Sequence, residues 1–261
     1  MGAAVESGQV AIEFRGVSKE YKLYRSDRHR FLGIFTSRVP FKRVFANKDL
    51  DFQIRRGESV AVMGKNGAGK STMLKMITGV VFPTRGEVIV NGRVSALLEL
   101  TAGFDKELTG RENVHLRGQI WGLEADEIAD LEEKVIDFAD IGDYIDQPMR
   151  TYSSGMKARV GFAISANINP EILVVDEALS VGDKAFREKC DRKIREIMEK
   201  EHVTVIFVTH SSGAAEAICD RGLVLKKGKL AFDGPISDAI EFYEGPRDPK
   251  RAKDDVYITD V

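Results

Sequence analysis

A glycine-rich segment, Gly64-Lys65-Asn66-Gly67-Ala68-Gly69-Lys70-Ser71-Thr72, separates the apolar run Ser59–Met63 from a stretch of helical character that ends at Gly79. It fits the pattern G-x-x-x-x-G-K-S/T in the context of strand, loop and helix that gives the pattern its meaning. A buried strand delivers such a loop, and the free N–H groups of the helix that follows point at an anion. We therefore expect a nucleoside triphosphate as the ligand.

Each residue type in this loop suits the binding of phosphate. Gly64, Gly67 and Gly69 let the backbone curl so that successive N–H groups point inward. Lys70 can reach the β- and γ-phosphates, and the Ser71 hydroxyl can ligate Mg²⁺. The other loop positions expected to contact the nucleotide are Asn66, Ala68 and Thr72. The alternative is a glycine turn with an accidental lysine, which the strand before the loop and the helix after it disfavour.

Composition and charge limit the classes of protein to consider. The chain has 261 residues, enough for one large core. Its 39 basic and 41 acidic side chains leave a formal charge of −2, so no overall basic field argues for nucleic acid binding. Cys190 and Cys219 lie in apolar helical patterns without ligand-like spacing, which predicts reduced core thiols and a reducing cytoplasm.

The sequence carries no pattern of a secretion signal or a membrane span. The first residues, Met1-Gly2-Ala3-Ala4-Val5, lack the charged-then-apolar order of a signal peptide. No apolar run approaches the roughly 20 residues that cross a bilayer. We therefore expect a soluble chain that can be peripheral to a membrane.

Alternating apolar residues predict an antiparallel part of the fold. The runs 10–17 and 49–54 are expected to be strands that pair antiparallel, the first of them of edge type. Residues 86–94 carry the dipeptide Asn91-Gly92 between apolar positions, which predicts a β-hairpin.

Short apolar runs predict a parallel part. Residues 172–175 and 203–208 have the composition of strands buried on both faces. A helix between them is indicated by the spacing of Phe186, Cys190, Ile194 and Ile197. A closing hairpin is predicted around Lys227-Gly228.

A helical insert is predicted for residues 105–150. Thr109 and Glu112 have the spacing of a capping box. One face of the following helix collects Ile128, Leu131, Val135 and Phe138.

Polar side chains follow the buried strands. Asp176-Glu177 comes directly after the run 172–175, and the carboxyl ends of parallel strands are where ligands bind. We expect Asp176 to hold Mg²⁺ and Glu177 to polarise the water that attacks the γ-phosphate. His210 follows the last of these strands, where a histidine can bond the γ-phosphate and orient the attacking water.

The segment Tyr152-Ser153-Ser154-Gly155-Met156 precedes a helix that is expected to run to about residue 167. Serine hydroxyls and free N–H groups at a helix start form an anion site. Taken alone, the segment is explained equally well as a plain N-cap.

The order of these motifs resembles that of the nucleotide-binding subunit of ATP-binding cassette (ABC) transporters over about residues 10–243. The resemblance makes 64–72 the Walker A loop, 152–156 the signature motif, 172–177 Walker B, 180–183 the D-loop and His210 the switch histidine. It implies a head-to-tail homodimer in which Ser153, Ser154 and Gly155 of one subunit cover the ATP held by Lys70 of the other. It also implies an integral-membrane permease as partner.

Two segments differ from the usual ABC motifs, and the differences indicate a particular group within the family. The signature reads Tyr-Ser-Ser-Gly-Met where most relatives have Leu-Ser-Gly-Gly-Gln, and residues 96–104, where the Q-loop falls, contain no glutamine. Both features resemble the exporters of lipid-linked polysaccharides such as O-antigen, capsule and teichoic-acid polymers. Glu99 is the nearest polar candidate for the glutamine's contact to Mg²⁺. The resemblance also implies an aromatic residue that stacks on adenine; Tyr21 is chosen over Tyr24, and packing is the alternative role for either.

A basic and aromatic insert lies at residues 25–43, and it too matches the polysaccharide exporters. Its basic residues are Arg25, Arg28, Arg30, Arg38, Lys42 and Arg43, and its apolar residues are Phe31, Leu32, Ile34, Phe35 and Phe41. Two interpretations are equally open. One is a surface excursion with a few buried rings, and the other is an amphipathic element that rests on a membrane face or a partner protein.

The sequence therefore predicts an α/β fold: a P-loop NTPase (RecA-like) core with an antiparallel β-subdomain and an inserted α-helical subdomain. The predicted core is 1–104 and 169–245, the helical subdomain 105–168 and a polar tail 246–261. We expect an ATP-hydrolysing subunit of a lipid-linked polysaccharide exporter, peripheral at the cytoplasmic face of the plasma membrane, with no nucleic acid partner. The alternative is a soluble ABC ATPase acting on nucleic acid or ribosomes, although such proteins usually carry two cassettes or a long coiled-coil interruption.

Overall fold

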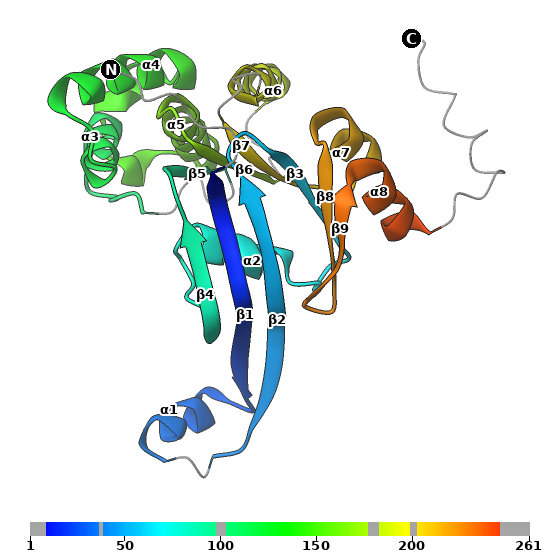
Figure 1. The fold of residues 1–261 in the computed structure, drawn as a ribbon. Helices are drawn as coiled ribbons and strands as arrows, with labels where there is room; N and C mark the ends of the chain where they lie inside the picture. The colour runs from blue at the N-terminus through cyan, green and yellow to red at the C-terminus, as the bar shows by residue number, and fades with distance from the viewer. Residues whose placement is uncertain (1–8, 37–38, 98–102, 177–182, 199–202, 246–261) are drawn as a thin grey trace. The chain divides into compact units, whose positions relative to one another are not determined.

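The computed structural model describes residues 9–36, 39–97, 103–176, 183–198 and 203–245 (Figure 1). The chain divides into two compact units. Unit 1 comprises Met1–Glu13, Gln53–Glu58 and Ile89–Phe207. Unit 2 comprises Phe14–Phe52, Ser59–Val88 and Val208–Val261.

The strands β5 (Val94–Ala96), β6 (Ile172–Asp176) and β7 (Thr204–Val208) run side by side in that order, and all their residues but Val208 belong to unit 1. β5 and β6 are parallel, with Val94 opposite Ile172. Every residue of β7 is buried, and so are those of β6 up to its last position. This is the pattern of strands covered on both faces, so the two buried strands predicted from apolar runs are confirmed.

The helices of unit 1 are α3 (Gly110–Ile120), α4 (Ala125–Ala139), α5 (Ser154–Asn167) and α6 (Lys184–Met198), with the 3₁₀ turns η1 (Gly142–Asp146) and η2 (Met149–Thr151). The predicted capping box opens α3: the Glu112 N–H donates to Thr109 Oγ1 at 3.1 Å, and the Thr109 N–H donates to the Glu112 carboxylate at 2.8 Å. Phe138, Phe162 and Phe186 come from α4, α5 and α6, and their ring centroids lie 5.6 to 6.3 Å apart. Within the described ranges, no helix is long and apolar enough to cross a membrane.

Unit 2 contains β3 (Ser59–Met63), β8 (Arg221–Lys226) and β9 (Lys229–Pro235), adjacent in that order, and the helices α2 (Lys70–Ile77), α7 (Ser212–Ile218) and α8 (Ile236–Glu244). β3 and β8 are parallel, and β8 and β9 form the predicted antiparallel hairpin. Its turn residues Lys227 and Gly228 have φ values of 51° and 78°, as a tight hairpin turn requires. α8 lies along β8 and β9 (Figure 1). The helix comes so close to β8 that a Cβ at Gly222 would overlap Ala239, so glycine at this position permits the packing.

A second sheet has the strand order β2 (Phe41–Arg55), β1 (Val10–Tyr24) and β4 (Arg85–Val90). β1 and β2 run in opposite directions, as predicted, and the helix α1 (Asp27–Phe35) lies between the end of β1 and the start of β2 (Figure 1). Phe14 and Phe52 stack across the two strands with their ring centroids 4.5 Å apart.

Two strand predictions are wrong. β1 is the central strand of its sheet and not an edge strand, because β4 pairs on the side away from β2. Alternation of apolar and polar residues indicates that one face of a strand is covered, but it does not indicate how many strands pair with it. The Asn91-Gly92 dipeptide forms no hairpin, since β4 and β5 belong to different sheets. The Asn91 N–H donates to the Ala11 carbonyl at 2.8 Å, whereas the Arg93 N–H donates to the Glu171 carboxylate at 3.1 Å. The dipeptide thus redirects the chain from one sheet to the next.

The two cysteines are buried free thiols. Cys190 lies in α6, and Cys219 lies directly after α7 and not within a helix. Burial raises the pKa of both thiols to about 12, so they stay protonated near neutral pH. The prediction of core thiols is confirmed.

Candidate active site

The loop after β3 favours glycine at both glycine positions of the pattern, Gly64 and Gly69, and also at Gly67 between them. Gly64, Gly67 and Gly69 have φ values of 152°, 77° and 106°, which residues with a side chain rarely adopt. A Cβ at Gly64 would lie 2.5 Å from the Leu225 carbonyl oxygen, and one at Gly69 would lie 2.6 Å from the Asn47 side-chain nitrogen. Without side chains at these positions the backbone can curl tightly, which is the geometry that cradles phosphate.

The helix α2 begins at Lys70, and no side chain caps its start. The first turn of such a helix offers N–H groups to an anion. The Lys70 side chain is buried, and its ammonium donates to the Gly64 carbonyl and, at 3.5 Å, to the Lys65 carbonyl. The lysine is therefore folded back over the loop. Ser71 is exposed in the same first turn, where its hydroxyl can coordinate a metal ion bound to the phosphates of a nucleotide.

Asn47 in β2 supports the loop and was not predicted from the sequence. It is fully buried, and its Nδ2 donates to the Gly69 carbonyl at 3.2 Å. Gly228, in the β8–β9 turn, donates its N–H to the Ala68 carbonyl at 3.0 Å and accepts from the Lys48 N–H at 2.7 Å. These contacts join residues distant in sequence, so no local pattern marks them.

The two tyrosines considered for adenine stacking lie near the end of β1 in different surroundings. Tyr24 is half-buried, and its ring packs against Phe41 with centroids 5.5 Å apart. Tyr21 is 39% exposed, and the Lys19 ammonium lies 5.4 Å from its ring centroid. Tyr24 thus contributes to packing, and Tyr21 is the more exposed of the two rings.

His210 is exposed directly after β7. The neighbouring Thr209 is buried, and its Oγ1 accepts from the Ser211 N–H at 2.9 Å. Ser211 in turn caps α7 by accepting from the Ala214 N–H at 3.3 Å. The backbone is therefore fixed on both sides of His210, which places the imidazole at the end of a buried strand.

Asp176 is the last residue of β6 and is half-buried. Its carboxylate stands at the carboxyl end of a parallel strand, which is the edge where ligands bind in such sheets. Glu177, Glu99 and the D-loop positions 180–182 lie outside the described residues.

The signature segment opens α5 through a serine cap. Ser153 Oγ accepts from the Met156 N–H at 3.2 Å, and Ser153 has the extended backbone of an N-cap. Ser154 is the first residue of α5 and is exposed, and Gly155 is half-buried. The predicted cap and helix are confirmed.

Arg159 joins the signature helix to α6, a link that the sequence did not reveal. Its guanidinium donates to the Asp183 carboxylate at 2.7 Å and lies 4.5 Å from the Phe186 ring centroid. Asp183 also accepts from the Phe186 N–H at 2.9 Å. The hydrogen bond from Phe186 and the charge of Arg159 lower the pKa of Asp183, so this carboxylate is ionised at neutral pH.

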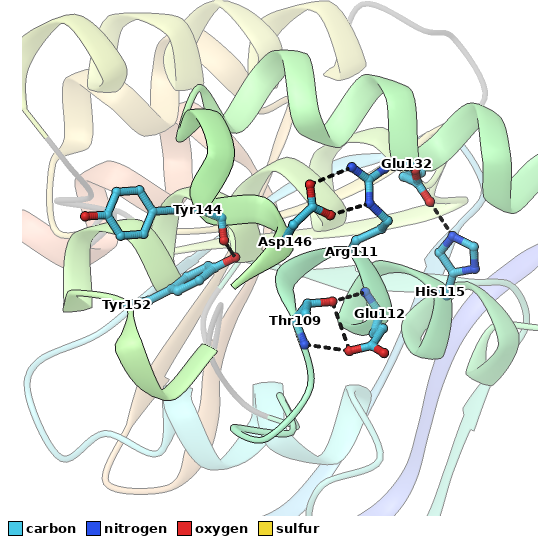
Figure 2. Close-up of polar contacts among 8 residues, drawn as sticks. All are labelled: Thr109, Arg111, Glu112, His115, Glu132, Tyr144, Asp146 and Tyr152. Atoms are coloured by element: carbon cyan, nitrogen blue, oxygen red, sulfur yellow. Dashed lines mark hydrogen bonds and ion pairs between the residues drawn. The ribbon is translucent and has the colours of Figure 1, made fainter. Parts of the chain in front are cut away.

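A charged network joins the helices that precede the signature segment (Figure 2). Arg111 of α3 donates to Asp146 of η1 at 2.7 Å and also to Glu132 of α4. Glu132 makes a second contact with His115 of α3. The hydrogen bond from Arg111 lowers the pKa of Asp146. Partial burial opposes ionisation of Glu132, but the bonds from His115 and Arg111 lower its pKa as well.

The predicted residues are distributed over both units. Unit 2 holds the phosphate loop, Tyr21 and His210, and unit 1 holds Asp176 and the signature segment.

A glycine loop between a buried strand and a helix, with a lysine folded over it and a carboxylate at the end of a parallel strand, defines a P-loop nucleoside triphosphatase. Residues 47–180 match the family described as ABC transporter. The chain belongs to that family, and it is an ATP-binding cassette with ATPase activity.

Similar proteins agree with this assignment. The chain is 42% identical to the O-antigen export system ATP-binding protein RfbB of Klebsiella pneumoniae, over 89% of this chain and 97% of that protein. It is also 42% identical to the teichoic acids export ATP-binding protein TagH of Listeria innocua, over 90% of this chain and 70% of that protein. Both relatives are export proteins, which favours the export prediction over the nucleic acid alternative.

The fold has solved counterparts. A dimeric ATP-binding cassette in a post-hydrolysis state, bound to ADP and Pi, matches with a TM-score of 0.66 and 23% identity, over 86% of this chain and 98% of that chain. The ATP-binding subunit of an ABC transporter matches with a TM-score of 0.68 and 24% identity, over 91% of this chain and 94% of that chain. These matches confirm the predicted α/β fold of the P-loop class.

Proposed function

We propose that this chain is the ATP-hydrolysing subunit of an exporter that moves a lipid-linked polysaccharide, such as O-antigen, capsule or teichoic acid, across the cytoplasmic membrane. The observation that carries the proposal is the 42% identity to RfbB over 97% of that protein's length. An integral-membrane permease is the partner, and the chain works at the inner face of the membrane.

Within the nucleotide site, Lys70 and the loop N–H groups bind the β- and γ-phosphates. Ser71 and Asp176 supply oxygen ligands of the kind that Mg²⁺ prefers, and the ion would neutralise charge on the phosphates. Glu177 polarises the attacking water, and His210 orients it toward the γ-phosphate.

Two copies of the chain close around ATP. The start of α5 offers N–H groups and the exposed Ser154, which suit the γ-phosphate bound by the loop of a second copy. ATP then joins the subunits, and hydrolysis releases them.

Three finer assignments follow from the resemblance to the nucleotide-binding subunits of ABC transporters. Tyr21 stacks on adenine, and Glu99 takes the place of the Q-loop glutamine near Mg²⁺. The chain consists of a core of 1–104 and 169–245 with a helical subdomain of 105–168, followed by the tail 246–261.

The helix α1 docks on the permease and on the anionic inner leaflet beside it. Its Phe31, Ile34 and Phe35 are 64%, 74% and 75% exposed, so these rings and chains do not pack on a core of their own. This favours the interpretation of the insert as a surface for a membrane or partner. Arg28 and Arg30 are exposed on the same helix, and basic groups near an anionic leaflet contribute about 1 kcal/mol each.

Loss of the gene in the source organism tests the proposal. Polymer should remain in the cytoplasm, and its export should return with the parental chain but not with Lys70→Ala. Co-purification of the chain with a permease from detergent-solubilised membranes tests the partner. Unchanged surface polymer in the deletion strain would reject the proposed substrate.

A further inference from the structure

Tyr152, the first residue of the signature segment, is held by its side-chain hydroxyl and by its main chain. It is buried, and its hydroxyl donates to the main-chain carbonyl of Tyr144 at 2.5 Å (Figure 2). Its backbone N–H donates to the Met149 carbonyl at 3.2 Å, at the end of η2. Burial raises the pKa of the phenol above its usual value, so the hydroxyl keeps the proton that it donates.

The start of α3 leaves room for this hydroxyl. A Cβ at Gly110 would overlap the Tyr152 oxygen and would lie 2.9 Å from Ile145 Cδ1. The Met149 N–H donates to the Leu108 carbonyl at 2.9 Å, which joins the same two regions through the main chain. The ring of Tyr152 therefore occupies a fixed position against α3 and η1.

The accepting carbonyl of Tyr144 is also held in place. Tyr144 belongs to η1, and Arg111 of α3 donates two hydrogen bonds of 2.7 and 3.2 Å to Asp146 of the same turn (Figure 2). A bidentate pair of this kind restricts orientation as well as distance. The Tyr144 carbonyl thus offers Tyr152 a partner in a defined direction.

We propose that the Tyr152 hydroxyl is a positioning group for ATP hydrolysis, because its bond to the Tyr144 carbonyl fixes the direction in which Ser153 and Ser154 open α5. Tyr152 directly precedes the N-cap, so a rotation at Tyr152 passes to the cap without an intervening residue. A leucine at this position, as in most cassettes, fills the space but cannot donate. The inference rests on the proposed function, in which Ser153, Ser154 and Gly155 cover the ATP of a second copy.

Tyr152→Phe is the direct test, because it keeps the ring and removes the donor. We expect kcat for MgATP to fall roughly tenfold, since a small misplacement of a positioning group is costly to the rate. In a Glu177→Gln background, ATP-dependent dimer formation on size-exclusion chromatography should need a correspondingly higher ATP concentration. Binding of a fluorescent ATP analogue to the monomeric chain should not change, because the phosphate loop contains none of the altered groups.

Two matched variants separate positioning from stability. Tyr144→Phe removes an exposed hydroxyl and keeps the accepting carbonyl, so it should retain the parental kcat. Val135→Ala leaves a cavity in the buried face of α4 without touching Tyr152, so it should lower the melting temperature and retain kcat. If Val135→Ala loses as much kcat as Tyr152→Phe at an equal loss of melting temperature, the hydroxyl has a structural role only and the proposal fails.

A third variant keeps this inference distinct from the proposed function. Ser154→Arg should abolish dimer closure and turnover if the signature segment covers ATP in a second copy. Normal turnover by Ser154→Arg would reject that arrangement. If Ser154→Arg loses turnover while Tyr152→Phe keeps the parental kcat and dimer formation, the role of the hydroxyl is rejected and the proposed function stands.

Discussion

The guanidinium of Arg159 in the signature helix donates to the carboxylate of Asp183 at 2.7 Å. Asp183 also caps the start of α6, because it accepts from the Phe186 N–H at 2.9 Å, so the ion pair ties α5 to the beginning of α6. Arg159→Lys keeps the charge and loses the planar group that lies over Phe186. We expect kcat to fall about three- to tenfold, with ATP binding to the monomer unchanged.

A double-mutant cycle checks this coupling. Arg159→Lys combined with Asp183→Asn should cost less activity than the sum of the two single changes, since both remove the same interaction. Strictly additive losses would show that the two residues act independently.

Lys70→Ala should weaken nucleotide binding itself. The ammonium is already folded over the loop, and a hydrogen bond from a charged donor contributes about 1.5–3 kcal/mol, so we expect the Kd for ATP to rise roughly 10- to 100-fold. Equilibrium binding of a fluorescent ATP analogue measures the change, and Lys65→Ala is the control, because Lys65 is exposed and engages the loop through its main chain. An unchanged Kd would contradict the assignment of Lys70.

Glu177→Gln should leave ATP binding intact and slow hydrolysis, because the amide cannot polarise the attacking water. We expect turnover to fall roughly 100-fold or more and a long-lived dimer to form with MgATP. Size-exclusion chromatography and phosphate release measure the two effects. Turnover at the parental rate would reject Glu177 as the base.

The helices around Arg111 should lose stability in acid. Glu132 and Asp146 have lowered pKa values in the folded chain, so they bind fewer protons folded than unfolded. Their stabilisation is complete above the ordinary values of 4.5 and 3.8, and it is lost as the pH falls through the lower folded values. The melting temperature should drop below about pH 4.5.

Glu132→Gln is the comparison for this pH effect. The variant should be less stable than the parental chain at pH 7 and should lose less of its stability between pH 5 and 3, because one of the titrating carboxylates is gone. Parallel curves for the two chains would show that Glu132 does not contribute.

Charge reversal on the insert should separate export from nucleotide binding. Replacing Arg28, Arg30 and Arg38 by Glu should leave ATP binding and melting temperature unchanged, while membrane retention and polymer export decrease. The first two residues lie on the exposed surface of α1, and Arg38 lies outside the described residues. Full export by the triple variant would reject the proposal that the insert docks on the permease and the membrane.

Residues whose role depends on local conformation could be predicted from the sequence. The glycines around Lys70 permit one loop shape, and the residues Thr109 and Ser153 cap helices through contacts within three positions. Hydrophobic period likewise predicted the buried face of α4, and a short apolar run predicted the strand at Ile172. In each case a few neighbouring residues determine the backbone.

Residues that act across the fold could not be predicted. Asn47 reaches the Gly69 carbonyl from 22 positions away, and Arg159 reaches Asp183 from 24 positions away. Such contacts depend on how strands and helices are placed, which no short pattern encodes. The failed hairpin at Asn91 has the same origin, because its flanking strands each find a better partner elsewhere.

The turn between β8 and β9 limits where the protein can be engineered. Hairpin turns usually tolerate inserted peptides, but the Gly228 main chain is bonded to Ala68 of the phosphate loop and to Lys48 of β2. A Cβ at Gly228 would lie 2.7 Å from the Ala46 carbonyl oxygen. A reporter or affinity tag placed in this turn would therefore displace the phosphate loop. The same turn is a place to reduce nucleotide affinity without altering any residue that touches phosphate.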